Sequence, residues 1–265
     1  MTSTPIWEGA DALTVRNGDR PRPEVAALPA DELPTVPLLF TFMRDAELRF
    51  ETLRLRIEER SLTTQGDHLV VTDVLMRHVG LARLTTTEPE AAATTGNYEL
   101  WLSDGSTVQT YSAAHHVGTR RPVRPMVRGV SGPGARDLPG RSRIYAPLTD
   151  LPMETLPDTF VHPGGYCQNV LGTGRCWISG TATVAGRQAI LLECDHPRTI
   201  EMVADRPDFH IQLAVDRADG VVLRLTESIG GVVTRRAEVV DYGPNAPLVS
   251  TAFDFSFPPG ATMMF

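Results

Sequence analysis

Hydrophobic and polar residues along this 265-residue chain follow two different periods. Over residues 38–50 apolar side chains recur at spacings of three and four, which predicts one short amphipathic helix. From residue 53 onward the spacing changes to two, because Leu53, Leu55 and Ile57 alternate with charged side chains, and this predicts a half-buried strand. Residues 69–79 are apolar at both odd and even positions, so we expect a strand that is covered on both faces.

Turn residues separate a series of short alternating strands farther along the chain. Asp104-Gly105 joins two such runs, and Asp-Gly is a strong hairpin signal because it supplies the positive φ angles of a tight turn. Further turns are expected at Val184-Ala185-Gly186, Ala218-Asp219-Gly220 and Gly230-Gly231. Successive hairpins predict an antiparallel sheet, which would leave an apolar face exposed unless other elements cover it.

Two predicted helices supply that cover, one at residues 38–50 and a second around residues 163–171. The predicted fold class is therefore α+β, with a curled antiparallel sheet and helices packed on one of its faces. Residues 1–37 are rich in proline and read as an irregular N-terminal arm. Residues 38–265 are expected to form a single domain with an inserted segment at about 120–174, which is rich in proline and glycine.

Three segments of the C-terminal half occur in an order that resembles a known family. They are GRQAILLE at residues 186–193, VDRADGVVLRL at 215–225 and AFDFSFPPG at 252–260. Their order is similar to that of the LolA-like outer-membrane lipoprotein carriers and of related periplasmic regulators of anti-sigma factors. The resemblance covers about residues 38–260 and includes W-x-x-D-G at 101–105. It implies an unclosed antiparallel barrel whose apolar concave face binds lipid or acyl chains or contacts a membrane-anchored regulator, and it implies no catalytic motif.

The resulting function hypothesis is a non-enzymatic binding module that holds a hydrophobic ligand, a lipid or acyl chain, against the concave face. The alternative is a regulatory protein that contacts a membrane-linked or signalling partner through the same surface. A ligand site would need a cavity of roughly 300 to 1,000 Å³ with residues 38–50 in its lid, whereas a solid core would favour the alternative. The candidate ligand-binding residues are Leu53, Leu55, Ile57, Trp101, Ile190, Leu192, Ile211, Leu213, Leu223 and Leu225.

Composition narrows the classes of partner. Hydrophobic residues make up 42% of the chain, which is typical of a packed protein. The net charge of −7 argues against nucleic acid, which selects basic surfaces. We expect no transmembrane segment, because no run of 18 apolar residues occurs. No basic, apolar and small-residue leader is recognisable near the start, so we expect a cytoplasmic location, although the family relatives are exported.

Five side chains of the types that bind zinc fall within 35 residues of one another. Their spacing is H-x4-C followed by C-x17-C-x-H, without a C-x2-C or H-x3-H pair. We therefore expect buried thiols and loop histidines with no metal and no cofactor, and a zinc site or a Cys/His-based enzyme is the minor alternative. The five residues are His162, Cys167, Cys176, Cys194 and His196.

The turn at residues 184–186 sets the position of two of these thiols. A three-residue loop pairs Thr183 with Arg187 and, counted back along the strands, places Cys176 directly opposite Cys194. A two-residue loop would instead send the two thiols to opposite faces. Three cysteines are an odd number, which fits reduced thiols better than a disulfide framework.

The densest run of charges lies at residues 195–208. Its Arg198 and Arg206 could bind an anion. We expect instead that the Arg and Asp side chains of this loop pair with one another at the surface.

Overall fold

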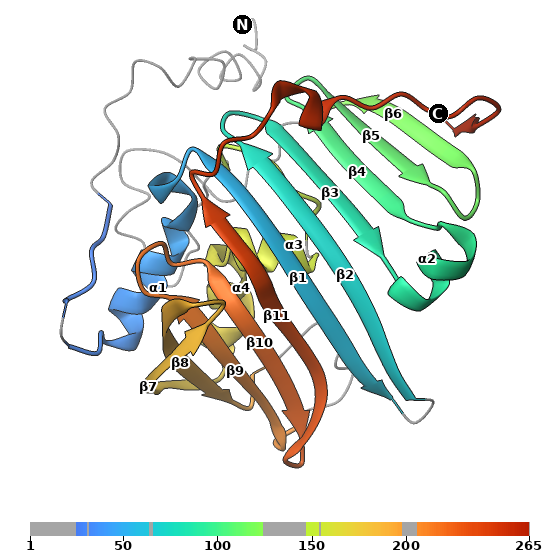
Figure 1. The fold of residues 1–265 in the computed structure, drawn as a ribbon. Coiled ribbons are helices and arrows are strands. Elements are labelled where there is room, and N and C mark those ends of the chain that lie inside the picture. Colours follow the sequence, from blue (N-terminus) through green and yellow to red (C-terminus); the bar gives the residue numbers. More distant parts are fainter. Residues whose placement is uncertain are drawn as a thin grey trace, which may run out of the picture.

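One sheet of twelve strands runs through the computed structural model, which describes residues 25–30, 32–63, 66–123, 147–153, 155–197 and 206–264 (Figure 1). The order across the sheet is β12-β6-β5-β4-β3-β2-β1-β11-β10-β9-β8-β7, and β12 and β6 are the one parallel pair among these described strands. Within the described residues β7 and β12 are the edges, so the sheet is curled but not closed, as the sequence predicted. The strands are β1 (Thr52–Thr63), β2 (Gly66–Arg77), β3 (Leu81–Thr87), β4 (Glu99–Asp104), β5 (Thr107–Ser112), β6 (Val117–Pro122), β7 (Arg175–Val184), β8 (Arg187–Asp195), β9 (Phe209–Asp216), β10 (Val222–Ile229), β11 (Val232–Pro244) and β12 (Thr262–Met264).

Helices α1, α3 and α4 lie on the inner side of the curl (Figure 1). The helix predicted at residues 38–50 exists as α1 followed by a short 3-10 helix, η2, and the helix predicted around residues 163–171 exists as α4 followed by η4. Helices α2 and α3 had no signal in the sequence pattern. The helices are α1 (Val36–Arg44), η2 (Ala46–Arg49), α2 (Pro89–Thr95), α3 (Leu156–Val161), α4 (Gly164–Asn169), η4 (Leu171–Thr173) and η5 (Ser250–Phe253).

The predicted domain limits are only partly covered by the described residues. Helix α1 begins at Val36, inside the predicted arm, and residues 1–24 and 31 lie outside the described part of the chain. Residues 124–146 and 154 of the predicted insertion also lie outside it. The division into an arm and one domain stays a prediction.

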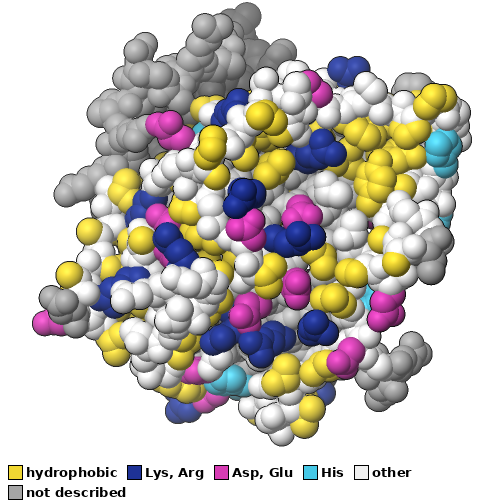
Figure 2. All heavy atoms as spheres, in the orientation of Figure 1, with side chains coloured by type: hydrophobic (Ala, Val, Ile, Leu, Met, Phe, Trp, Pro, Cys, Tyr) yellow, Lys and Arg dark blue, Asp and Glu magenta, His cyan; other side chains and the backbone are white. Residues whose placement is uncertain are grey.

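The alternation predicted for β1 is confirmed. Leu53, Leu55 and Ile57 point to the inner face and are at most 1% exposed. Arg54 and Arg56 lie on the outer face. Charged side chains therefore follow the middle of the outer face, over β1, β2 and β11 (Figure 2).

The prediction for residues 69–79 is correct only for part of that run. Strand β2 ends at Arg77, and Val79 lies beyond it with 62% of its surface exposed. Val74 and Met76 are fully buried on the inner face, and Val71 is buried on the outer face. The strand is thus covered on both faces near its middle, but its end is a turn.

The loop between β7 and β8 differs from the prediction. It has two residues, Ala185 and Gly186, because Val184 pairs with Arg187. Ala185 adopts a φ of 50°, which residues other than glycine seldom do, and this is why the sequence pointed to a longer loop. A β-bulge at Ser179 then shifts the register by one residue, so Cys176 still lies opposite Cys194. The predicted thiol pair is correct, although two compensating features produce it.

The hydrophobic core consists of a large inner cluster and a smaller outer one. The inner cluster joins the helices to β1–β3 and β7–β11. The outer cluster contains Leu100, Leu102 and Tyr111, and it is covered by Phe255 and Phe257. These two side chains belong to residues 246–264, the C-terminal strap, which crosses the ends of several strands (Figure 1). The strap gives the outer face of β4–β6 the cover that an apolar sheet face requires.

Candidate ligand-binding site

The structure gathers the candidate ligand-binding residues on the inner face of the sheet. Nine of the ten are at most 1% exposed, and Trp101 is partly buried beside them. Strand pairing aligns three of them, because Leu192 lies opposite Leu213 and Leu213 lies opposite Leu225. These residues therefore belong to the inner core of the curl, and whether they bind a ligand stays a prediction.

The cover of this face is two short helical segments that pack directly on it. Helix α1 contributes Leu39 and Met43, and the segment from α3 to η4 (residues 155–173, here called the lid) contributes Phe160 and Leu171. All four of these side chains are 0% exposed. A cavity that admits water would leave the side chains along its wall partly exposed. The nine buried candidate residues are at most 1% exposed, so no such cavity borders them. The prediction of a preformed cavity beneath residues 38–50 is wrong, because α1 fills that space.

One polar group in this interface has no hydrogen-bond partner. The hydroxyl of Tyr166, on α4, is buried and unpaired. Burial and the nearby carboxylate of Glu227 raise the pKa of Tyr166 well above its ordinary value, and Arg235 works in the opposite direction. The hydroxyl therefore faces the part of the inner face where β10 and β11 carry charged side chains. A buried hydroxyl without a partner costs about 1–3 kcal/mol of stability, so it indicates a place for another polar group. The sequence offered no signal for this residue beyond its place in a predicted helix.

A cluster of polar side chains, formed by His162, Asp158 and Glu47, anchors the chain near the lid. His162 is 3% exposed. Its Nδ1 atom lies 3.0 Å from Asp158 Oδ1, and its Nε2 atom lies 3.3 Å from Glu47 Oε2. Burial alone would lower the pKa of His162, but the two carboxylates outweigh it and raise the pKa to about 9. The same Glu47 oxygen accepts a hydrogen bond from the amide of Leu148 at 2.9 Å. The charged histidine thus joins η2 to the lid, a role that zinc-ligand spacing did not suggest.

The five residues considered as zinc ligands lie in several different environments. His162 contacts carboxylates, and the thiol of Cys167 lies 3.8 Å from the sulfur of Met43. Cys176 and Cys194 face each other across β7 and β8 as free thiols. Within the described residues no group of three or more His, Cys, Asp or Glu side chains is arranged to hold a metal ion.

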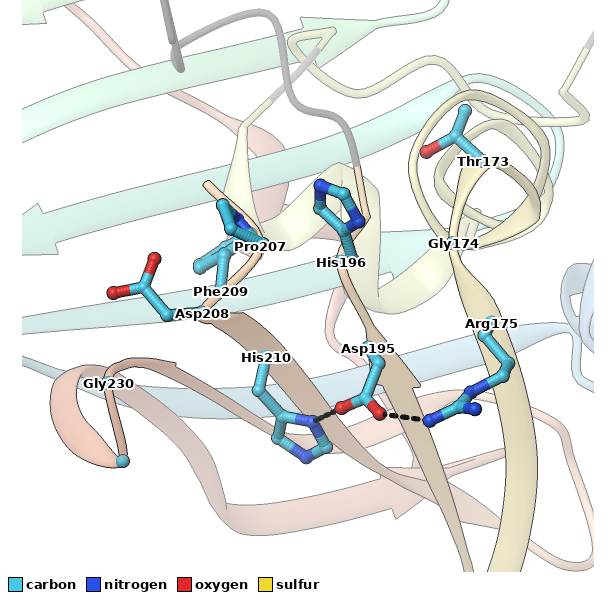
Figure 3. Close-up of a pocket in the computed structure, with 11 residues that line it drawn as sticks. Thr173, Gly174, Arg175, Asp195, His196, Pro207, Asp208, Phe209, His210 and Gly230 are labelled. Atoms are coloured by element: carbon cyan, nitrogen blue, oxygen red, sulfur yellow. Dashed lines mark hydrogen bonds and ion pairs between the residues drawn. The ribbon is translucent and has the colours of Figure 1, made fainter. Parts of the chain in front are cut away.

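A pocket of about 600 Å³ opens at the end of the sheet where β7 and β9 begin and β8 ends (Figure 3). His210 is one of its lining residues, with Nδ1 at 2.8 Å from Asp195 and Nε2 at 2.7 Å from Glu193. Arg175 extends the chain of charges through a hydrogen bond of 2.9 Å to Asp195. Burial lowers the pKa of His210, but Asp195 and Glu193 raise it further than burial lowers it.

Among the described residues around His210, none is a free acid, base or nucleophile. Both ring nitrogens of His210 are bonded to carboxylates, so the ring has no nitrogen left to accept a proton from a substrate. Arg206 pairs with Asp208 at 2.9 Å, as the sequence predicted for this charged loop, and Arg198 lies outside the described residues. The arrangement is a set of surface ion pairs around an open hollow.

A second pocket of about 340 Å³ lies at the other edge of the sheet, between β5, β6 and Met264 of the strap. It is lined by none of the ten candidate ligand-binding residues. Among the described helices, none has both the length and the apolar character needed to cross a membrane.

Comparisons with known proteins concern the fold alone. No protein-family model matches the chain, and no curated protein matches it. Solved structures do match. An uncharacterised conserved protein of Thermus thermophilus aligns over 85% of this chain and 96% of its own, with 10% identity and a TM-score of 0.47. A LolA-superfamily protein of Nitrosomonas europaea aligns over 84% of this chain and 99% of its own, with 11% identity and a TM-score of 0.29.

A third structure is MucB of Pseudomonas aeruginosa in complex with MucA, which aligns over 81% of this chain with 13% identity and a TM-score of 0.42. The chain spans 58% of the length of that protein. The matching structures thus include the LolA-like proteins that the sequence motifs resemble.

Proposed function

We propose that this protein is a non-enzymatic binding module for a hydrophobic ligand, a lipid or acyl chain, which lies on the inner face of the sheet after the lid has moved away. The unpaired hydroxyl of Tyr166, buried between the lid and the sheet, is the observation that carries the proposal. Tyr166 moves with the lid, so its hydroxyl supplies a hydrogen-bond donor for the polar end of a ligand that lies between the displaced lid and the sheet, while the apolar part of the ligand contacts the buried side chains.

A solid core by itself favours the regulatory alternative, so ligand binding requires the lid to be displaced. The structure of the lid supports such a displacement. Helices α3 and α4 have six residues each, and η4 has three. Helices this short are not stable without packing, so they hold their shape only where they contact the sheet and α1. Gly164 and Gly165 at the start of α4 provide backbone freedom in the middle of the lid, and Gly172 and Gly174 provide it at the C-terminal end.

An acyl chain would replace the contacts that the lid now makes. Phe160 and Leu171 of the lid are fully buried against the inner cluster. Each buried methylene of a ligand contributes about 0.8 kcal/mol, so a long acyl chain can compensate for the exposure of these side chains. The LolA-like resemblance of the C-terminal motifs implies the same class of ligand.

Extraction of the purified protein followed by mass spectrometry is the first test. A co-purifying lipid or fatty acid in near-stoichiometric amount supports the proposal. A protein that carries no lipid, binds no added fluorescent long-chain fatty acid and retains a defined protein partner contradicts it and supports the regulatory alternative.

Tyr166→Phe provides a sharper test, with Tyr98→Phe in the outer cluster as the matched control. Removal of an unpaired buried hydroxyl should leave the free protein as stable as before or more stable. The same change should weaken binding of a long-chain fatty acid roughly 5- to 10-fold, because one hydrogen bond to the ligand is lost. Equal affinities for the wild type and both variants would show that the hydroxyl does not contact the ligand.

A further inference from the structure

Two thiols meet next to the end of the lid, on the first two strands that follow it. Cys176 on β7 lies directly opposite Cys194 on β8. Both sulfurs are close to the carbonyl oxygen of Leu171 in η4, at 3.1 Å for Cys176 and 3.5 Å for Cys194. Gly174 lies against the sulfur of Cys194, because a Cβ atom at position 174 would be 2.7 Å from Cys194 Sγ. The packing leaves little room around the pair except on the side of Cys176.

The two thiols differ in access and in acidity. Cys176 is partly exposed, whereas Cys194 is 0% exposed. A hydrogen bond from Cys194 lowers the pKa of the Cys176 thiol, and the same contact together with burial raises the pKa of Cys194. Cys176 is therefore the thiol that a reagent reaches first, and it is the one that forms a thiolate more readily.

We propose that Cys176 and Cys194 form a reversible disulfide that weakens the attachment of the lid. Directly opposed residues on antiparallel strands have Cβ atoms about 4.5 to 5.5 Å apart, and a disulfide needs only a small further approach. This proposal gives the proposed ligand site a form of regulation and rests on that function for its biological meaning.

The chemistry requires a small disulfide as the two-electron oxidant, for example oxidised glutathione. The Cys176 thiolate attacks one sulfur of the oxidant, which forms a mixed disulfide and releases one glutathione thiolate. Cys194 loses its proton to water and attacks the Cys176 sulfur, which forms the protein disulfide and releases the second glutathione. Two protein thiols are oxidised, and one glutathione disulfide is reduced to two thiols.

The disulfide changes the hydrogen bonding of the lid. In the reduced protein a thiol proton is available to the Leu171 carbonyl, whereas neither sulfur of a disulfide can donate one. The carbonyl group lies within η4, whose turn also contains the hydrogen bond from Gly174 N to Leu171 O at 3.1 Å. Oxidation therefore removes the side-chain donors from the junction between the lid and β7.

The test combines mass spectrometry with hydrogen exchange of the whole chain. Treatment with oxidised glutathione should lower the mass by about 2 Da, and peptide mapping should join Cys176 to Cys194 with Cys167 left free. Exchange of amides in residues 170–174 should then become several-fold faster, and dithiothreitol should reverse both effects. Failure to form this bond in the folded protein overturns the proposal.

Cysteine variants separate formation of the disulfide from its effect on hydrogen exchange in the lid. Cys176→Ser and Cys194→Ser should each abolish the mass change, whereas Cys167→Ser should keep it. A disulfide that forms without faster exchange in residues 170–174 overturns the lid mechanism. Neither readout uses a ligand, so a failure here is distinct from a failure of the fatty-acid binding experiment.

Discussion

Arg187 donates hydrogen bonds to both carboxylate oxygens of Asp216, at 2.7 and 2.9 Å. Asp216 is 1% exposed, and its Oδ1 also accepts hydrogen bonds from the amides of Ala218 and Asp219. The same guanidinium reaches Asp219 Oδ2 at 2.7 Å, and Tyr242 of β11 donates to that oxygen at 3.1 Å. This group of residues joins β8, the β9–β10 turn and β11 at one end of the curl, and it gives the G-R and V-D-x-x-x-G segments a shared structural role.

Arg187→Met should therefore destabilise the fold. It leaves the buried Asp216 and the half-buried Asp219 near each other without their cation, and the loss of one partner of a buried ion pair costs several kcal/mol. We expect a decrease of about 2–4 kcal/mol in the free energy of unfolding, measured by urea denaturation. Arg206→Met, at the exposed pair with Asp208, is the control and should unfold like the wild type. Identical midpoints for both variants would show that the cluster has no structural role.

The two faces of β1 should respond very differently to substitution. Leu55→Asp buries an unpaired carboxylate in the inner cluster, which should cost about 3–5 kcal/mol. Arg54→Gln removes one side of an exposed ion pair with Asp241, 2.9 Å apart, and should cost at most about 1 kcal/mol. Thermal unfolding of the two variants measures the difference. If Leu55→Asp unfolds at the temperature of Arg54→Gln, the assignment of Leu55 to the inner face is wrong.

The attachment of the C-terminal strap depends on one glycine of β6. A Cβ at Gly118 would lie too close to Cε1 of Phe257, so Gly118→Ala should push this ring away from the outer cluster. We expect a loss of about 1–3 kcal/mol and faster hydrogen exchange at Thr262–Met264, which pair with β6. Gly165→Ala is the matched control, because a Cβ there meets nothing within 4 Å and alanine favours a helix. Unchanged exchange in Gly118→Ala would show that Phe257 is free to rotate out of contact.

Much of the sheet could be predicted from the sequence, because alternation fixes which side chains share a face. Leu53, Leu55 and Ile57 illustrate this, since each is buried as the pattern required. The length of the turn between β7 and β8 was harder to predict, because Ala185 occupies a backbone conformation that alanine disfavours. A bulge such as the one at Ser179 has no local sequence signal of its own, and here it restored the expected pairing of the thiols.

The arrangement of the lid could not be predicted in the same way. Helix α3 has six residues, too few for the helical period to emerge, and its burial depends on contacts with elements far away in the chain. The unpaired hydroxyl of Tyr166 and the ion pair between Glu47 and His162 are likewise products of packing. The site therefore depends on residues that gain their roles only in three dimensions.

His162 should make the stability of the protein depend on pH above neutrality. Its pKa is raised from an ordinary value of 6.5 to about 9, so the folded protein holds a proton that the unfolded chain releases. The stabilisation is fully present below pH 6.5 and is lost as the pH rises through about 9. A pKa shift of this size corresponds to about 3 kcal/mol. Urea denaturation at intervals between pH 6.5 and 9.5 measures the slope.

The other titrating groups around His162 can be separated from it in the same experiment. His78 contacts the backbone of Glu47, and burial lowers the pKa of His78. His78 therefore affects stability only at pH values below about 6.5, where stability is lost as the pH decreases. The raised pKa of His210 changes stability with pH in the same direction as that of His162. The dependence of stability on pH should therefore be measured in a His210→Gln background, with and without a further substitution. In that background His162→Gln should flatten the profile, whereas His68→Gln, at an exposed pair with Glu88, should keep it. A profile already flat with His162 in place would mean that this histidine is neutral in the folded protein.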